Sequence, residues 1–228
     1  MPMKSVEAGK IVVAPDPFRR DSDRCVALGI STGGPPALAT VFAALRPPLP
    51  PIVIVQHMPA QFTKSFAERL NGLSALTVKE AEHGERPLPD HAYIAPGGRH
   101  LGLERRGATI RLVVRDGEPV SGHRPSVDVL MTDAARFYGE RCLGVIMTGM
   151  GRDGAAGCAA IRAAGGTVLG QDQASSDVYG MNKVAFVEGH VDRQFSLDDA
   201  AQTLMREARA IGRKSSTPTV CSLGSERS

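Results

Sequence analysis

Strand-like apolar runs alternate with segments of helical periodicity along most of this chain. Continuous apolar runs of strand length occur at residues 26–30, 51–56, 142–149 and 167–172. Segments with an apolar residue every three or four positions occur at residues 35–45, 60–73, 126–139, 155–166 and 197–212. Uninterrupted apolar strands are typical of a parallel sheet buried on both faces. The pattern therefore predicts an α/β fold with a doubly wound, mostly parallel sheet and helices on both of its faces.

The middle of the chain and its two ends depart from this alternation. Short strands are predicted at residues 76–81, 92–98, 100–105 and 109–114, some of them in hairpins. We therefore expect a small antiparallel hairpin insertion. Residues 1–23 are polar and punctuated by prolines, which is typical of a linker, and residues 213–228 have the composition of a disordered tail. A folded domain is expected between them, over residues 24–212.

Composition and charge narrow the range of functions. The net charge of +3 and an aromatic content of 4%, without tryptophan, argue against a nucleic-acid-binding protein. No apolar run reaches membrane-spanning length, and the N-terminus lacks the apolar core of a signal peptide. The four cysteines are scattered without a CxxC spacing, at Cys25, Cys142, Cys158 and Cys221. Free thiols in a reducing, cytoplasmic location are therefore expected, rather than disulfides or a zinc site.

Three polar side chains occur at or just after the ends of apolar runs. They are Ser31, His57 and Asp153. Because the carboxyl ends of parallel strands meet at one edge of a sheet, ligand and catalytic sites gather there. A serine is a weak nucleophile until a base takes its proton, a histidine titrates near neutral pH, and a carboxylate fixes the histidine tautomer. Together the three residues are the chemical types of an acyl-transfer triad.

The turn that contains Ser31 has features of a nucleophile position. Residues 29–33 match the G-x-S-x-G pattern of the nucleophile elbow. The order Ser, His, Asp along the chain differs from the Ser, Asp, His order of α/β-hydrolases. We therefore expect a similar turn at the serine, but not the α/β-hydrolase fold. A helix beginning near Pro35 is expected to direct its N-terminal amides at a developing oxyanion.

Each candidate has an ordinary explanation when it is taken alone. Ser31 can be a helix cap, His57 a strand-end histidine and Asp153 a turn residue. His100 also lies near the end of a predicted strand and can line the same cleft. It is the coincidence of three suitable side chains at strand ends that favours an enzyme.

A second pattern in the same region favours a different function. Residues 149–154, GMGRDG, match G-x-G-x-x-G after a strand and before a helix, and Asp172 ends the next strand at the spacing of a ribose-binding acid. The alternative is therefore a dinucleotide-binding oxidoreductase. Against it, Asp153 would lie beside the pyrophosphate, where like charges repel, although Arg152 would partly offset that charge.

Several longer motifs, in a fixed order, are more specific than any of these patterns. They are ISTGG (30–34), QHMPAQFTKSFAERLN (56–71), VKEAEHGERPLPDHAYIAPGGRH (78–100), HRPSVDVLM (123–131), GVIMTGMGRDGAAG (144–157) and YGMNKVA (179–185). In these motifs the chain resembles the catalytic domain of the CheB-type protein-glutamate methylesterases of bacterial chemotaxis. The resemblance runs from about residue 26 to about residue 191, which implies that residues 24–212 form a methylesterase catalytic domain.

The resemblance implies a serine esterase that acts on the cytoplasmic helices of methylated chemoreceptors. The reaction is hydrolysis of glutamate γ-methyl esters to glutamate and methanol, with possible deamidation of receptor glutamines. Residue by residue, it implies that Ser31 is the nucleophile, His57 its base and Asp153 the residue that orients the base. The backbone amide of Met150 is implied as an oxyanion contributor, with Thr32 in support. No cofactor and no metal are expected.

The chain departs from the family pattern in three respects, of which one is that Pro35 and Pro36 replace more ordinary helix-start residues. Family members usually carry an N-terminal receiver domain and a linker, and we expect that domain to be absent from these 228 residues. Arg152 takes a position where asparagine is common in the family. Its positive charge is expected to alter the preference of the site for substrate charge. The expected partners are methylated chemoreceptor helices, without nucleic acid and without insertion into a membrane.

Overall fold

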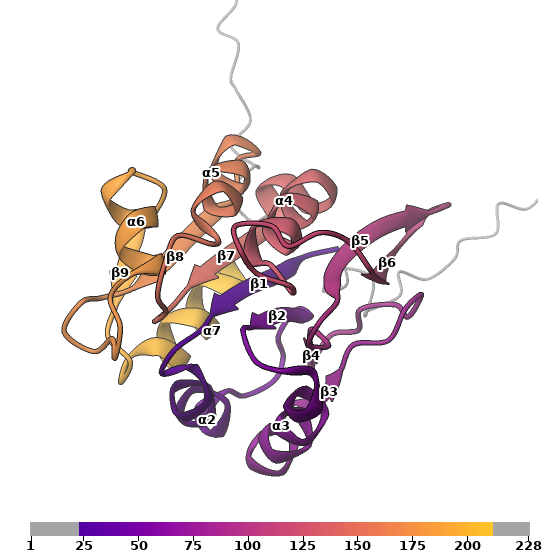
Figure 1. The fold of residues 1–228 in the computed structure, drawn as a ribbon, viewed down its shortest axis with the longest axis horizontal. Coiled ribbons are helices and arrows are strands. Elements are labelled where there is room, and N and C mark those ends of the chain that lie inside the picture. The colour runs from indigo at the N-terminus through magenta and orange to yellow at the C-terminus, as the bar shows by residue number, and fades with distance from the viewer. Residues whose placement is uncertain (1–22, 212–228) are drawn as a thin grey trace, which may run out of the picture.

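The structure is a computed structural model that describes residues 23–211. Its main sheet has seven parallel strands in the order β3-β4-β2-β1-β7-β8-β9 (Figure 1). The strands are β1 (Cys25–Ile30), β2 (Ile52–Gln56), β3 (Thr77–Glu80), β4 (His91–Ile94), β7 (Cys142–Ile146), β8 (Thr167–Gln171) and β9 (Arg193–Phe195). A separate antiparallel hairpin joins β5 (His100–Arg106) to β6 (Thr109–Arg115). The predicted doubly wound α/β fold with a small hairpin insertion is confirmed.

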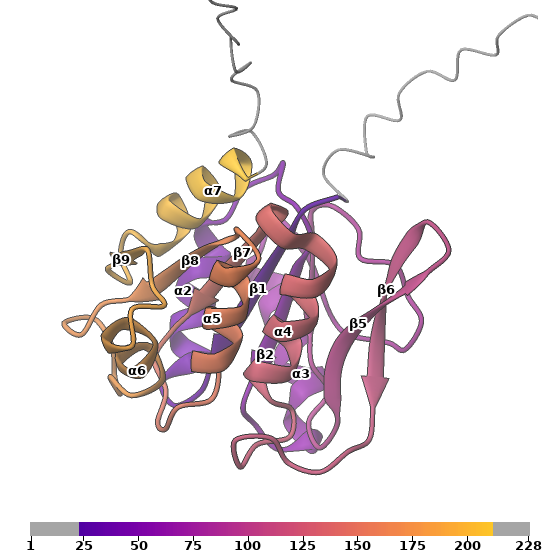
Figure 2. The ribbon, with the colours of Figure 1, turned by 90° about the horizontal axis from the view of Figure 1, so that it is seen from above.

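Helices cover both faces of the main sheet (Figure 2). They are α2 (Gly34–Ala44), α3 (Ala60–Leu73), α4 (Val127–Tyr138), α5 (Ala155–Ala163), α6 (Met181–Val187) and α7 (Ala200–Ala210), with a short 3-10 helix η1 at Gly139–Arg141. Helices α2, α3 and α7 pack in one hydrophobic cluster, and α4, α5 and α6 pack in the other. Successive residues of β1 and β2 point alternately into the two clusters, which explains why their apolar runs are uninterrupted.

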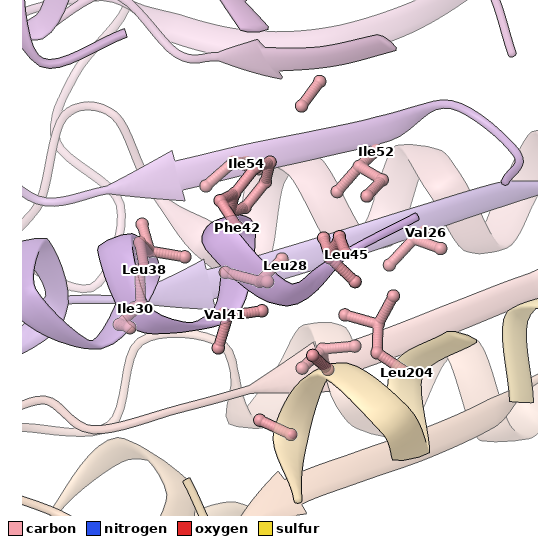
Figure 3. Close-up of a cluster of buried hydrophobic side chains, with 14 of the residues drawn as sticks. Val26, Leu28, Ile30, Leu38, Val41, Phe42, Leu45, Ile52, Ile54 and Leu204 are labelled. Atoms are coloured by element: carbon pink, nitrogen blue, oxygen red, sulfur yellow. The ribbon is translucent and has the colours of Figure 1, made fainter. Parts of the chain in front are cut away.

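The first cluster is a close-packed core between α2, α7 and the sheet (Figure 3). Leu28, Leu38, Phe42 and Ile54 are fully buried in it. Each buried side chain of this kind contributes about 1.5–3 kcal/mol relative to an exposed one. The central strands are therefore rigid, and they fix the residues that follow their carboxyl ends.

Several predicted boundaries differ from the structure. Strands β3 and β4 belong to the main parallel sheet, so of these four predicted short strands, all within the described residues, only β5 and β6 pair as an antiparallel hairpin. Two short elements, α6 and β9, were not predicted, because seven and three residues are too few for a clear periodic signal. Residues 1–22 and 212–228, where the tails are predicted, lie outside the described residues.

The strand order reverses direction between β1 and β7. From β1 the chain proceeds through α2 to β2 on one side, and from β7 it proceeds through α5 to β8 on the other. The two helices lie on opposite faces of the sheet. A reversal of this kind opens a crevice at the carboxyl ends of the two strands, and ligand sites of doubly wound folds lie there.

Candidate active site

Ser31 and His57 follow neighbouring strands at the same edge of the sheet. The last residues of β1 and β2, Ile30 and Gln56, are paired in register, and the His57 amide donates a hydrogen bond of 3.2 Å to the Ile30 carbonyl. The Gln56 side-chain amide donates to the carbonyls of both Ser31 and His57, at 3.0 Å each. A buried glutamine therefore ties together the two backbone segments that carry the candidate nucleophile and base.

Ser31 lies in a tight turn between β1 and α2. The turn is closed by a bond of 2.8 Å from the Gly34 amide to the Ser31 carbonyl, and Gly33 has a φ of 79°. The Ser31 amide donates to the carbonyl of Thr148 beyond β7. On this side the backbone of Gly149 is so close that a Cβ atom there would lie 2.7 Å from Ser31 Cβ. Only glycine fits beside the serine.

His57 and Asp153 are in direct contact. The distance from His57 Nε2 to Asp153 Oδ2 is 2.8 Å, and the side chains are 9% and 0% exposed. His57 Nδ1 is buried, and no group within residues 23–211 accepts from it or donates to it. A carboxylate beside Nε2 keeps the proton on that nitrogen, which leaves the lone pair on Nδ1. Nδ1 is therefore the nitrogen that can act as a base.

No hydrogen bond joins Ser31 Oγ to His57 among the described residues. Hydrogen bonds between a nucleophile and its base are often loose without substrate and tighten when the substrate binds. The structure thus brings the three predicted residues to the same edge of the sheet and pairs two of them.

Asp153 is held by the N-terminus of α4. Besides His57, its carboxylate accepts from Ser126 Oγ at 2.7 Å, from the Val127 amide at 2.7 Å and from the Asp128 amide at 3.0 Å. Burial by itself raises the pKa of Asp153, but these hydrogen bonds outweigh it and hold the pKa below its ordinary value. Asp153 is thus a fixed, ionised partner for His57.

A second histidine covers the face of His57. The His123 and His57 rings are stacked with centroids 3.9 Å apart and planes at 7°. His123 Nδ1 lies 2.8 Å from the Ser121 carbonyl, which fixes the ring. Ligand atoms of His57, His123 and Asp153 lie within 4.8 Å of one another. A histidine binds a metal ion with a nitrogen lone pair that lies in the plane of its ring. Because the planes of these two stacked rings are nearly parallel, their lone pairs do not meet at one ion in this arrangement.

The amides available to an oxyanion are not those of α2. The Gly34 amide donates to the Ser31 carbonyl, and the Ala37 amide donates to the Gly33 carbonyl. Between them, Pro35 and Pro36 have no amide hydrogen. The expectation that this helix would direct free amides at the reaction is therefore wrong.

The amides of Thr32 and Met150, by contrast, donate to no acceptor within the described part of the chain. The Thr32 carbonyl accepts from Thr148 Oγ1 at 2.9 Å, which supports its turn. Met150 is 72% exposed, so the loop that carries its amide is open to solvent. An amide directly after a nucleophile and one from a second loop are the usual pair of oxyanion donors.

The glycine loop at residues 149–154 is not arranged for a dinucleotide. The amides of Gly154 and Gly157 at the start of α5 are occupied by Asp128 Oδ1, at 2.9 and 2.8 Å. A phosphate would need those amides. Asp172, the candidate for ribose binding, accepts instead from the amide and hydroxyl of Ser175 in a local turn.

Four residues at this site have contacts that the sequence patterns did not predict. Ser126, Asp128 and His123 surround the His57–Asp153 pair, and His100 lies behind them. His100 is buried and bonded to the Glu118 carbonyl and the Ser126 amide, so it supports α4 rather than lining the crevice. Arg152 forms an exposed ion pair with Glu188 at 3.2 Å. In the sequence, the segment at residues 123–128 carries a histidine, a serine and an aspartate close together, and this grouping indicates a polar site without indicating its contacts.

Comparison with known proteins agrees with the fold and the motifs. The family model described as CheB methylesterase matches residues 26–204. A protein of Pectobacterium atrosepticum, named protein-glutamate methylesterase/protein-glutamine glutaminase, is 50% identical over 189 residues, which are 83% of this chain and 54% of that protein. A protein of Albidiferax ferrireducens, named protein-glutamate methylesterase/protein-glutamine glutaminase 2, is 52% identical over 192 residues, or 84% of this chain and 56% of that protein.

A solved structure gives the same result. The crystal structure of the Thermotoga maritima CheB methylesterase catalytic domain matches with a TM-score of 0.78 and 40% identity, over 80% of this chain and 97% of that chain. The chain spans about half the length of the curated relatives it matches. None of these matches supports the oxidoreductase alternative. From its fold, its motifs and these matches, the chain belongs to the CheB methylesterase family.

Proposed function

We propose that this protein hydrolyses glutamate γ-methyl esters on the cytoplasmic helices of chemoreceptors, with Ser31 as nucleophile, His57 as base and Asp153 as the residue that orients the base. The observation that carries the proposal is the 2.8 Å contact between His57 and Asp153, with Nδ1 left unpartnered. The names of the relatives support the substrate class.

In the first half of the reaction, His57 Nδ1 takes the proton of Ser31 Oγ while the oxygen attacks the ester carbonyl. Asp153 stabilises the imidazolium that forms. The tetrahedral intermediate places its negative oxygen between the amides of Thr32 and Met150. His57 then gives the proton to the methoxy oxygen, the carbon–oxygen bond breaks, and methanol leaves an acyl-enzyme on Ser31.

In the second half, water replaces the alcohol. His57 removes a proton from the water, which attacks the acyl carbon, and the proton returns to Ser31 as the glutamate is released. A glutamine amide fits the same sequence of steps, with ammonia as the leaving group. Deamidation of receptor glutamines is therefore the second activity that we propose for this site.

A direct test is the release of methanol from receptor-containing membranes whose glutamates carry labelled methyl esters. We expect release by the protein and at least a hundredfold less by the His57→Ala variant, since a triad base of this type contributes about 10⁴ or more to turnover. His190→Ala is the matched control, because His190 is a partly exposed histidine beside Glu188 after α6. Equal loss in both variants, or no methanol from the unaltered protein, would contradict the proposal.

A further inference from the structure

We propose that Asp128 is a positioning residue for this reaction, which acts by fixing Asp153 and, through Ser121, the turn that carries His123. The inference rests on the proposed function. It comes from a reciprocal arrangement in which the carboxylate near the start of each of two helices binds amides at the start of the other.

The reciprocal contacts join α4 and α5. Asp153, just before α5, accepts from the Val127 and Asp128 amides at the start of α4. Asp128, in the first turn of α4, accepts through Oδ1 from the Gly154 and Gly157 amides at the start of α5. Because Gly154 directly follows Asp153, this second pair of bonds fixes the backbone on which the triad carboxylate is carried.

Asp128 does not have the usual role of an acidic residue in the first turn of a helix. Such residues commonly face solvent or the amides of their own helix. The Asp128 side chain is buried instead, and α4 is capped by Ser126, which accepts from the Val129 amide. Burial raises the pKa of Asp128, with a smaller contribution from the charge of Asp153. A buried acid next to a second one lowers stability, so its presence calls for a role beyond helix capping.

The other oxygen of Asp128 reaches the turn beneath His123. Asp128 Oδ2 accepts from Ser121 Oγ at 2.9 Å. Ser121 and Gly122 both have positive φ, 51° and 77°, and the ends of the turn, Val120 and His123, are paired by two hydrogen bonds of 3.0 Å. Positive φ at both central positions is strained for serine, and the Asp128 contact offsets part of that cost.

These contacts close a loop around the imidazole of His57. One branch runs from His57 through Asp153 to the start of α4 and Asp128, and the other runs from Asp128 through Ser121 to His123, which stacks on His57. The ring of the base is thus held at its edge by Asp153 and on its face by His123. Asp128 is the residue common to both branches, and it is itself buried, with its carboxylate bonded to Ser121, Gly154 and Gly157.

The test uses Asp128→Ala, Asp128→Asn and Ser121→Ala, with Asp133→Ala as the matched control. Asp133 is another α4 aspartate, but its carboxylate accepts from the Leu103 amide of β5, away from the crevice. We expect Asp128→Ala to lower kcat for methanol release about ten- to a hundredfold with KM nearly unchanged, the scale of a misplaced catalytic group. Asp128→Asn retains an acceptor for Gly154 and Gly157 and is expected to restore most of kcat.

A second readout does not need the esterase activity. The Nε2 proton of His57 gives a downfield proton resonance when it is hydrogen-bonded to Asp153, and we expect Asp128→Ala to shift or broaden it while Asp133→Ala leaves it in place. If the unaltered protein releases no methanol, the proposed function fails and this resonance alone decides the inference.

Three results would overturn the inference. The first is a folded Asp128→Ala protein with parental kcat and an unmoved resonance. The others are an equal fall in kcat in Asp128→Ala and Asp128→Asn, and a fall in kcat that Asp133→Ala reproduces. If Asp128→Ala does not fold, Ser121→Ala decides. It removes one hydrogen bond and is expected to lower kcat about threefold, and a parental kcat and resonance in that variant would contradict the inference.

Discussion

His57 Nε2 lies 2.8 Å from Asp153 Oδ2, and in the proposed mechanism this contact exchanges the usual tasks of the two imidazole nitrogens. In the familiar serine triads the carboxylate binds Nδ1 and the serine faces Nε2. Here Nε2 is the nitrogen bound to the carboxylate, and the buried Nδ1 remains open for a proton. The chemistry is the same, because either nitrogen can be the base once the other carries the hydrogen.

Replacement of Asp153 by asparagine is expected to lower the rate of methyl ester hydrolysis at least about a hundredfold, compared with about 10⁴ for the corresponding change in a serine protease triad. The amide group would donate to Nε2, so the proton would move to Nδ1 and no lone pair would face Ser31. The assay is methanol release by a variant whose circular dichroism matches that of the parent. Hydrolysis at the parental rate would remove Asp153 from the mechanism.

The stability of the protein is expected to depend on pH through Asp153. The fold holds the pKa of Asp153 below its ordinary value, so the ionised carboxylate stabilises the folded state. This contribution to the free energy of unfolding is fully present above the unfolded-state pKa of about 4, and it is lost as the pH falls through the lower folded-state pKa. The raised pKa of Asp128 acts in the opposite direction. Its main cause, burial, remains in Asp153→Asn, whereas the smaller contribution from the charge of Asp153 is removed.

Urea unfolding between pH 7 and pH 3 checks this dependence. The free energy of unfolding of the parent should fall below about pH 4 more steeply than that of Asp153→Asn. Parallel curves for the two proteins would show that the carboxylate is not held in its ionised form by the fold.

Gly149→Ala is expected to damage both stability and turnover. The added Cβ would lie 2.7 Å from Ser31 Cβ and closer still to Met181 Sδ, so Ser31 or α6 must move. The expected costs are about 1–3 kcal/mol in the free energy of unfolding and at least about tenfold in kcat.

Gly72→Ala is the matched control, because Gly72 lies in α3 and an added Cβ there meets nothing within 4 Å. It should raise stability by about 0.5–1 kcal/mol and leave kcat unchanged. Chemical unfolding and methanol release measure both effects, and equal kcat values for the two variants would contradict the close approach of Gly149 to Ser31.

The sequence predicted those parts of the site that depend on strand ends. The predicted Ser31, His57 and Asp153 lie at one edge of the sheet because parallel strands end there, and this rule needs only the positions of β1, β2 and β7. Their catalytic roles stay a prediction. The role of α2 was predicted wrongly, because a helix start was inferred without counting that Pro35 and Pro36 have no amide hydrogens. A helix with two prolines in its first turn lacks two of the amides that would otherwise be free at its N-terminus.

The contacts of His123 and Asp128 depend on geometry that no local pattern carries. His123 reaches His57 through a turn in which Ser121 adopts a positive φ, a conformation that serine rarely takes. Asp128 lies in an ordinary amphipathic helix, and its carboxylate has a function only because α5 begins beside it. Such relations between distant segments appear only when the helices are packed.

Whether Ser31 is the nucleophile is decided by methanol release from methylated receptor membranes by Ser31→Ala, compared with Ser65→Ala. Ser65 is an exposed serine of α3 whose hydroxyl, in the part of the chain that the structure describes, bonds only to the Phe62 carbonyl, so its loss should leave the rate unchanged. Ser31 Oγ has no hydrogen-bond partner within residues 23–211, so its loss should leave the fold intact. We expect folded Ser31→Ala protein without measurable methanol release, and near-parental release by that variant would show that Ser31 is not the nucleophile.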